Sequence, residues 1–124
     1  MARILVVDDE RDVVTLIKFM LEKDGHQVFE AYNGQEALDK LETLEPAPDL
    51  VILDVMMPVM DGYTLASRLG ESPKHRAVPL LVLTAKGEMR DLFELAPNVA
   101  SYIEKPFDPK TLRELIAGML KKAA

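Results

Sequence analysis

Short apolar runs alternate with amphipathic segments along the whole chain, and this alternation restricts the possible fold more than any other feature. The five runs typical of strands are residues 4–7, 28–31, 50–53, 80–83 and 100–103. The first, third and fourth runs are apolar at every position. Strands of this kind are covered on both faces, so the sequence predicts a parallel sheet.

Between the runs, apolar residues recur at helical spacing. The predicted helices are a segment over 13–21 that Gly25 stops, a helix capped by Asn33 with Ala37, Leu38, Leu41 and Leu44 inward, a short helix capped by Asp61, a helix containing Met89, Leu92, Phe93 and Ala96, and a last helix that starts at Asp108 and Pro109. Strand and helix repeated five times predict a doubly wound (βα)5 α/β fold, with helices on both faces of the sheet and right-handed crossovers. At 124 residues we expect one domain over 1–124.

Composition excludes several classes of protein. The chain has no cysteine, which removes disulfides, thiol nucleophiles and cysteine metal sites. A net charge of -6 argues against non-specific binding to nucleic acid or to anionic membranes. Asp8 and Asp9 interrupt the first apolar run, so no signal peptide fits, and no segment is apolar enough to cross a bilayer. We therefore expect a cytoplasmic protein with no direct nucleic-acid contact and no membrane insertion.

Charged side chains follow the predicted strands where each strand ends. Asp8 and Asp9 follow the first run, Asp54 the third and Lys105 the fifth. In open α/β sheets ligands bind beyond the carboxyl ends of strands. Converging carboxylates repel one another unless a cation is present, and Mg²⁺ prefers such ligands. The alternative is that Asp8 and Asp9 cap the first helix and that Asp54 forms a turn.

Asp54, Lys105 and Thr84 together indicate phosphoryl transfer. A carboxylate at the floor of a pocket can attack phosphorus and form an aspartyl-phosphate. A metal ion and a lysine would relieve the charge at phosphorus, and the Thr84 hydroxyl at the end of the fourth run would bind a phosphoryl oxygen. By itself, each of these residues has an ordinary structural role.

The resemblance to a known family lies in five short segments. They are Val6-Val7-Asp8-Asp9-Glu10, Leu53-Asp54-Val55-Met56-Met57-Pro58, Met60-Asp61-Gly62, Leu83-Thr84-Ala85 and Lys105-Pro106-Phe107. Their order and content resemble the receiver domain of response regulators in two-component signalling, most closely the single-domain, chemotaxis-regulator type. The resemblance covers essentially the whole chain and implies a flavodoxin-like strand order of 2-1-3-4-5.

The resemblance also assigns roles to residues at the acidic site. Asp54 is similar to the phosphoacceptor, and Asp8 and Asp9 to the acidic pair, with Asp9 the more direct metal ligand. Met56 would add its backbone carbonyl to the metal site, which implies Mg²⁺, with Mn²⁺ as a substitute. Lys105 would hold the phosphoryl group through its ammonium and would precede a cis peptide bond at Pro106.

Further implications concern the switch and its partners. Thr84 and Tyr102 resemble the switch pair that reshapes a face built from the fourth helix, fifth strand and fifth helix. The donor would be a sensor histidine kinase or a phosphotransfer protein, and the output a downstream protein target or a fused effector domain. The chain would be a monomer or a phosphorylation-dependent dimer. It would not be a conventional enzyme, although Mg²⁺-dependent self-phosphorylation and dephosphorylation of Asp54 are expected.

Two other functions remain open from the residues alone. A phosphatase with an aspartate nucleophile would share the metal and the acyl-phosphate, but it normally has a second acid where Met56 stands. A binding module that has lost phosphorylation would keep the fold without the chemistry. Met56, Met57 and Met60 are expected to fill gaps rather than to form a partner surface, and His26 and His75 to be surface residues.

Overall fold

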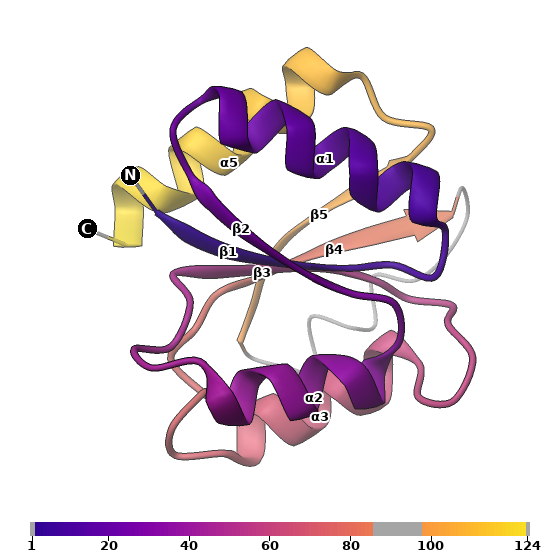
Figure 1. The fold of residues 1–124 in the computed structure, drawn as a ribbon, viewed down its shortest axis with the longest axis vertical. Coiled ribbons are helices and arrows are strands. Elements are labelled where there is room, and N and C mark those ends of the chain that lie inside the picture. The colour runs from indigo at the N-terminus through magenta and orange to yellow at the C-terminus, as the bar shows by residue number, and fades with distance from the viewer. Residues whose placement is uncertain (1, 86–97, 124) are drawn as a thin grey trace.

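Five parallel strands form one sheet between two layers of helices (Figure 1). The computed structural model describes residues 2–85 and 98–123. The strands are β1 (Arg3–Val7), β2 (Gln27–Ala31), β3 (Leu50–Asp54), β4 (Leu80–Ala85) and β5 (Val99–Lys105), and the helices are α1 (Arg11–Lys23), α2 (Gly34–Thr43), α3 (Gly62–Glu71) and α5 (Pro109–Ala123). The strand order is β2-β1-β3-β4-β5, as the resemblance implied. The predicted fold class is therefore confirmed.

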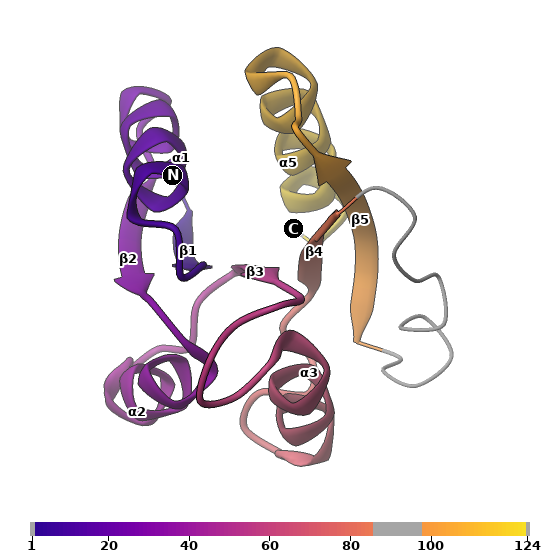
Figure 2. The same ribbon diagram turned by 90° about the vertical axis from the view of Figure 1, so that its right-hand side faces the viewer.

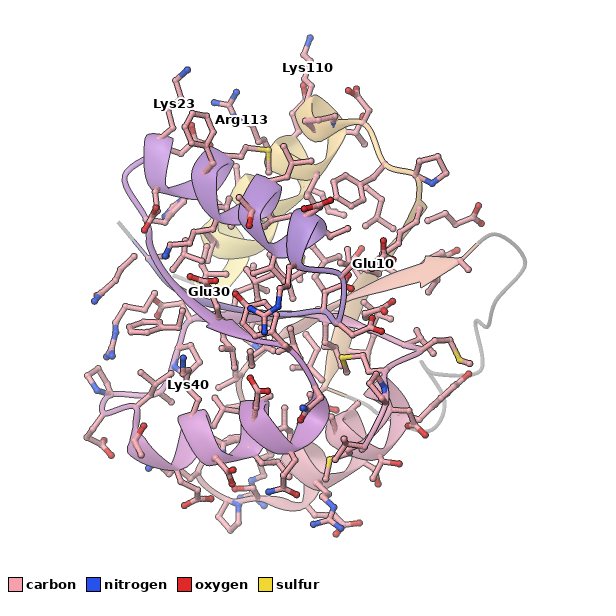
Figure 3. All side chains as sticks on the ribbon, turned by 45° about the vertical axis from the view of Figure 1, so that its right-hand side comes forward. Glu10, Lys23, Glu30, Lys40, Lys110 and Arg113 are labelled. Carbon is pink, nitrogen blue, oxygen red and sulfur yellow. The ribbon has the colours of Figure 1, made fainter. Side chains whose placement is uncertain are left out.

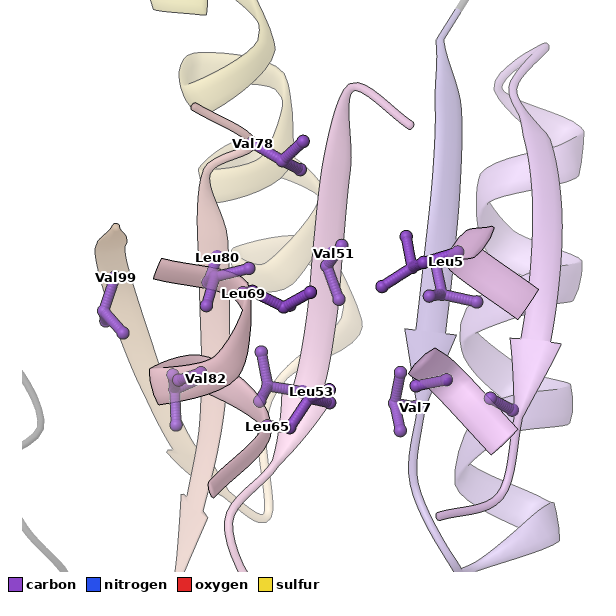
Figure 4. Close-up of a cluster of buried hydrophobic side chains, with 14 of the residues drawn as sticks. Leu5, Val7, Val51, Leu53, Leu65, Leu69, Val78, Leu80, Val82 and Val99 are labelled. Carbon is purple, nitrogen blue, oxygen red and sulfur yellow. The ribbon is translucent and has the colours of Figure 1, made fainter. Parts of the chain in front are cut away.

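The helices cover opposite faces of the sheet, α1 and α5 on one and α2 and α3 on the other (Figure 2). Because successive side chains of a strand point to opposite faces, each central strand contributes to both cores. In β1, Leu5 and Val7 belong to the core on the side of α2 and α3, and Ile4 and Val6 to the core on the side of α1 and α5. Figure 4 shows part of the first core. This double burial explains the uninterrupted apolar runs.

Local signals at the helix ends act as predicted. The Asn33 side chain accepts a hydrogen bond from the Glu36 amide at 2.8 Å, and the Asp61 side chain accepts one from the Thr64 amide at 2.8 Å. Both satisfy amides that the first turn of a helix leaves without a partner. Gly25 follows α1 with a φ of 92°, a conformation that glycine adopts without strain. The predicted helix around Met89 to Ala96 lies outside the described residues.

The chain changes direction at β1, and this change fixes where a ligand can bind. β1 pairs in parallel with β2 on one side and with β3 on the other. The connections after β1 and β3 therefore leave towards opposite faces, through α1 and α3. The crevice between them opens at the carboxyl ends of β1 and β3, where the sequence places Asp8, Asp9 and Asp54.

A bulge in β5 decides which way Tyr102 faces. Leu80 pairs with Val99, but Leu81 pairs with Ser101, so Ala100 is an extra residue in the ladder. An extra residue reverses the side-chain alternation beyond it. As a result, Val99 and Tyr102 both pack on the side of α2 and α3 although they are three positions apart.

Two further observations concern surface and membrane. The prediction of a surface histidine is wrong for His75, which is 3% exposed, with its Nδ1 atom 3.2 Å from the Ser72 hydroxyl. Within residues 2–85 and 98–123, the helices are too short or too polar to span a lipid bilayer.

Candidate functional site

Three carboxylates meet at the carboxyl ends of β1 and β3. Asp8 and Asp9 follow β1 directly and Asp54 is the last residue of β3. Each offers an oxygen atom, and the three oxygens lie within 4.8 Å of one another. Asp8 and Asp54 are buried, whereas Asp9 is exposed. The group therefore has one open side, through which an ion or a substrate can enter.

Lys105 brings a positive charge to this group from the end of β5. Its Nζ atom lies 2.8 Å from Asp8 Oδ2, 3.4 Å from Asp54 Oδ1 and 3.4 Å from Glu10 Oε1. The Lys105–Pro106 peptide bond is cis, as the resemblance implied. Glu10 stands in the connection between β1 and α1 (Figure 3). One ammonium group thus faces three carboxylates, which leaves an excess of negative charge around it.

Burial and mutual repulsion change the protonation of these acids. Burial, together with the negative charge of Asp8, raises the pKa of Asp54 to about 6, against the lowering effect of Lys105. Burial also raises the pKa of Asp8 despite its hydrogen bonds from Lys105 and from the Glu10 amide. Burial lowers the pKa of Lys105, but the hydrogen bond to Asp8 and the negative charges of Asp8, Asp54 and Glu10 together raise it overall. The site is therefore short of positive charge without a metal ion.

Thr84 adds a buried hydroxyl group next to this region. It is the fifth residue of β4 and pairs with Glu104 of β5, directly before the Ala85–Lys105 pair. Its Oγ1 atom is buried and has no hydrogen-bond partner among residues 2–85 and 98–123. A buried hydroxyl without a partner costs free energy, so its retention favours a role in binding a ligand atom.

The loop after Asp54 is tied back to the strand it leaves. The Gly62 amide donates to the Val55 carbonyl at 2.7 Å. A Cβ atom on Gly62 would lie 2.3 Å from the Asp54 carbonyl oxygen, a distance that no side chain can accept. Only glycine at this position lets α3 begin against the backbone of Asp54. The loop 55–61 therefore begins beside Asp54 and returns to it at the start of α3.

The structure brings together most of the predicted site residues. Asp8, Asp9, Asp54 and Lys105 form one cluster. The capping alternative for the acidic pair is weak, because Glu10 occupies the N-cap position of α1 and makes no side-chain cap.

Two other predicted residues have side chains outside this cluster. Met56 follows Asp54 in the loop 55–61, and its side chain is 66% exposed. Tyr102 packs against the core beside α2 and α3, three residues before Lys105.

Sequence reasoning missed the roles of Glu10 and Gly62. Glu10 was noted only as part of a motif, yet its carboxylate is a third partner of Lys105. Its position next to the acidic pair was the available signal. Gly62 was likewise noted only as part of a motif, and no sequence pattern shows that its missing Cβ leaves room for the Asp54 carbonyl.

Comparison with known proteins gives the family. The model of the response regulator receiver domain matches residues 4–117. The chain belongs to this family. This receiver domain is 39% identical over 122 residues to the alkaline phosphatase synthesis transcriptional regulatory protein PhoP of Bacillus subtilis, covering 98% of this chain and 49% of PhoP. It is 37% identical over 123 residues to the transcriptional regulatory protein ResD of the same organism, covering 98% of this chain and 49% of ResD.

Solved receiver structures share the fold over nearly the full chain. The receiver domain of the Francisella response regulator 1452 superposes with a TM-score of 0.86 at 26% identity, with 100% of both chains covered. The chemotaxis response regulator CheY4 of Vibrio cholerae gives a TM-score of 0.85 at 27% identity, covering 96% of this chain and 98% of CheY4. The receiver domain spans about half the length of PhoP and ResD. The family match and these structures agree that the chain is a receiver domain of the two-component response regulator type.

Proposed function

We propose that this receiver domain accepts a phosphoryl group on Asp54 and converts it into a change of its protein-binding surface. The observation that carries the proposal is the position of Asp54. Its carboxylate stands at the end of a buried strand, 3.4 Å from the Lys105 ammonium and within the same group as Asp8 and Asp9. Its raised pKa in an excess of negative charge destabilises the metal-free fold and is typical of functional sites, which supports the proposal.

The transfer follows from the atoms present. An Asp54 carboxylate oxygen attacks phosphorus, the new O–P bond forms, and the bond from phosphorus to the donor atom breaks. With a phosphohistidine donor the electron pair of the P–N bond returns to the imidazole. Lys105 attracts the phosphoryl oxygens that face it, and the Thr84 hydroxyl donates to another. These contacts strengthen as charge accumulates in the transition state.

The residues present fit a divalent cation. Asp8, Asp9 and Asp54 offer oxygen ligands, and the Met56 carbonyl is a fourth candidate, which is the donor set that Mg²⁺ or Mn²⁺ takes. When bound, the ion would offset the negative charge of the acidic group and of the phosphoryl oxygens, and so would reduce the repulsion between the attacking carboxylate and those oxygens. Asp8 already accepts hydrogen bonds from Lys105 on one oxygen and from the Glu10 amide on the other. Asp9, which is exposed, is therefore the more accessible direct ligand.

Phosphorylation then alters the surface beside β5. The phosphoryl group brings about -1.5 to -2 of charge into the site. Lys105 moves from Asp8 towards this charge, Thr84 turns to donate to it, and Tyr102 moves into the space that is vacated. A shift from 1:99 to 99:1 between two states requires about 5.5 kcal/mol, which a few charge-assisted hydrogen bonds supply. The affected face is formed by β5 and α5.

The partners follow from this chemistry. The donor is the phosphohistidine of a sensor kinase or of a phosphotransfer protein in the cytoplasm. The output is a downstream protein or an effector domain attached to the receiver, so contact with nucleic acid would come through that effector. The domain acts stoichiometrically and is not a conventional enzyme, although it promotes its own phosphorylation and dephosphorylation.

The test is direct phosphorylation with a small donor. Purified protein is incubated with acetyl phosphate and Mg²⁺, and the intact mass is measured. The wild type gains the mass of one phosphoryl group, and Asp54→Asn and an EDTA-treated sample do not. A wild type that gains no mass, beside a control receiver that does, contradicts the proposal. A wild type that instead hydrolyses small phosphomonoesters with many turnovers is a phosphatase.

A further inference from the structure

The turn that joins β2 to α2, residues 31–34, contacts the segment that carries the acidic pair. The Asp8 amide donates to the Ala31 carbonyl at 3.2 Å. The Arg11 guanidinium lies over the Tyr32 ring, 4.2 Å from its centroid, a distance at which cation and ring attract each other. Because Asp8 and Arg11 enclose the connection from β1 to α1, the β2–α2 turn holds this connection at both ends.

The same turn contacts the loop 55–61 on its other side. The Gly34 amide donates to the Met60 carbonyl at 3.3 Å. Gly34 is buried at the first position of α2, where an amide has no partner inside the helix. The loop thus supplies the acceptor that this amide lacks, and Gly34 supplies a fixed point for the loop.

A tight turn in the loop precedes this contact. The Met60 amide donates to the Pro58 carbonyl at 2.7 Å across Val59, whose φ is 71°, so these three residues form a γ-turn. A β-branched residue rarely adopts this conformation, and such strain persists only where the surrounding structure imposes it. The hydrogen bond from Gly34 is one restraint of this kind, and the burial of Met57 is another.

The three methionines of the loop differ in how firmly they are held. Met57 is buried and Met60 packs against the core, which confirms for these two the expectation that they fill gaps. The expectation is wrong for Met56, whose side chain is 66% exposed. The position of the Met56 carbonyl, the candidate ligand, therefore depends on restraints elsewhere in the loop, and the contact between Gly34 and Met60 is one of them.

Gly34 leaves no room for a side chain. A Cβ atom there would lie 2.7 Å from the Met60 carbonyl oxygen and 2.8 Å from the Met60 Cβ and Cγ atoms. Ordinary contact begins at 3.4 Å, so the oxygen and the new Cβ would have to separate by a further 0.7 Å. Ala37 and Leu41 anchor α2 in the core, so we expect the loop 55–61 to move rather than the helix.

A displacement of this size matters to a small cation. Mg²⁺ requires nearly octahedral ligands at about 2.0–2.1 Å, whereas Ca²⁺ accepts oxygens at about 2.3–2.6 Å in a flexible arrangement. The acidic pair would not follow the loop, because the Asp8 amide is bonded to β2 and its carboxylate to Lys105. The loop and the acidic pair would then no longer fit one ion of the smaller radius.

We propose that the β2–α2 turn sets the separation between the acidic pair and the loop 55–61, with Gly34 as a positioning residue of the divalent-cation site. Gly34 acts through the Met60 carbonyl and touches neither the ion nor the phosphoryl group. The inference rests on the proposed function, because it requires the loop to contribute a ligand to the ion that supports transfer to Asp54.

The test compares two glycine variants. Gly34→Ala adds the Cβ atom that meets Met60, and Gly118→Ala is the matched control, because a Cβ atom at that position of α5 meets nothing within 4 Å. Each protein is titrated with MgCl₂ and with CaCl₂ and followed by NMR, and urea unfolding gives its stability separately. We expect folded Gly34→Ala to bind Mg²⁺ about tenfold more weakly, as is typical when a residue that orients metal ligands is changed. Its affinity for Ca²⁺ falls less, and Gly118→Ala binds both ions as the wild type does.

Two results of these titrations overturn the proposal. If folded Gly34→Ala binds Mg²⁺ as tightly as the wild type, the added Cβ is accommodated without a change at the cation site. If the affinities for Mg²⁺ and Ca²⁺ fall by the same factor, the variant has loosened the site in general and Gly34 does not set its spacing.

A second measurement uses the wild type alone and decides the matter even where Gly34→Ala does not fold. Coupling between two sites is reciprocal, so bound Mg²⁺ has to strengthen the hydrogen bond from Gly34 to Met60. Saturating Mg²⁺ should slow hydrogen exchange of the Gly34 amide about tenfold, the same factor as above. The Leu44 amide, bonded to Lys40 at the other end of α2, should exchange as before.

An unchanged Gly34 amide overturns the proposal. Equal slowing of the Gly34 and Leu44 amides overturns it as well, because the ion then stabilises the whole fold and not this contact. A wild type that binds no Mg²⁺, or that gains no phosphoryl mass from acetyl phosphate, contradicts the proposed function itself. That failure is distinguishable, because it appears without any change at Gly34.

Discussion

Replacing Asp54 by asparagine should make the metal-free protein more stable at neutral pH. The reason is that the folded state favours the protonated form of Asp54, so the ionised carboxylate destabilises the fold at neutral pH. Burial and the charge of Asp8 raise the pKa of Asp54 from 3.8 to about 6. Asparagine has nearly the same shape and removes the charge. The substitution therefore relieves the cost that the acceptor imposes on the fold.

The magnitude follows from proton linkage. A raised pKa means that the folded state binds the proton more tightly than the unfolded state does, so stability falls as pH rises from about 4 to about 6. The shift of about two pKa units corresponds to about 3 kcal/mol once Asp54 is ionised in both states. Asparagine loses the attraction to Lys105, which reduces the gain. We expect a gain of about 1–3 kcal/mol at pH 7.5, or about 4 °C in Tm for each kcal/mol.

The assay is urea unfolding in EDTA, followed by circular dichroism, at pH 7.5 and at pH 5. At pH 5 the gain should fall to about half, because the folded state is then largely protonated at Asp54. Asp39→Asn is the matched control: the same substitution at an exposed carboxylate of α2 changes the net charge equally without relieving burial. With saturating Mg²⁺ the difference between wild type and Asp54→Asn should narrow, since the wild type binds the ion more tightly.

Two results would refute this reasoning. If Asp54→Asn is no more stable than Asp39→Asn at pH 7.5 in EDTA, Asp54 is not strained by its charge. If its advantage is as large at pH 5 as at pH 7.5, the gain has a cause other than ionisation of this carboxylate.

Three other substitutions have outcomes that the structure fixes. Lys105→Met should bind Mg²⁺ several-fold more tightly in a titration followed by NMR, because the Lys105 ammonium competes with the ion for the same carboxylates. Phosphorylation of this variant by acetyl phosphate should be slower than that of the wild type. Weaker Mg²⁺ binding by the variant would contradict this competition. Gly62→Ala should cost about 3 kcal/mol in urea unfolding through its clash with the Asp54 carbonyl, whereas Gly118→Ala, with open space at its Cβ, should gain up to about 1 kcal/mol. Thr84→Val should leave stability unchanged or raise it by about 1 kcal/mol, because it removes a buried hydroxyl that has no partner in the described part of the chain. The same substitution should slow phosphorylation. A clear loss of stability would mean that the hydroxyl has a partner in the fold.

The sheet could be predicted because its rules are local and strong. Runs such as Leu50–Leu53, short and bounded by turn residues, are typical of strands buried on both faces, and Asn33 and Asp61 mark helix starts by a hydrogen bond within one turn. The bulge at Ala100 could not be predicted, since it depends on how β5 pairs with β4. The prediction for His75 was wrong for a similar reason. The polarity of a histidine does not show whether the path of the α3–β4 connection, in which His75 lies, buries its side chain.

The site divides in the same way. Residues at the ends of strands could be grouped because parallel strands end at one edge, and this placed Asp8, Asp54 and Lys105 together. The contacts made by the segments between strands and helices could not be predicted from the sequence. The third partner of Lys105, Glu10, depends on the path from β1 to α1. The γ-turn at Val59 depends on a loop that must return to Asp54 within a few residues.

The acceptor site and the fold have opposite requirements, and their combination accounts for the switch. Asp54 needs a buried, poorly neutralised carboxylate to react, and Thr84 needs a hydroxyl without a partner to bind a new oxygen. Both weaken the metal-free state. A phosphoryl group satisfies Thr84 and Lys105 together, so its binding free energy acts mainly on the state in which these groups have moved. A site fully satisfied before phosphorylation would leave no such difference, and the surface beside β5 would not respond.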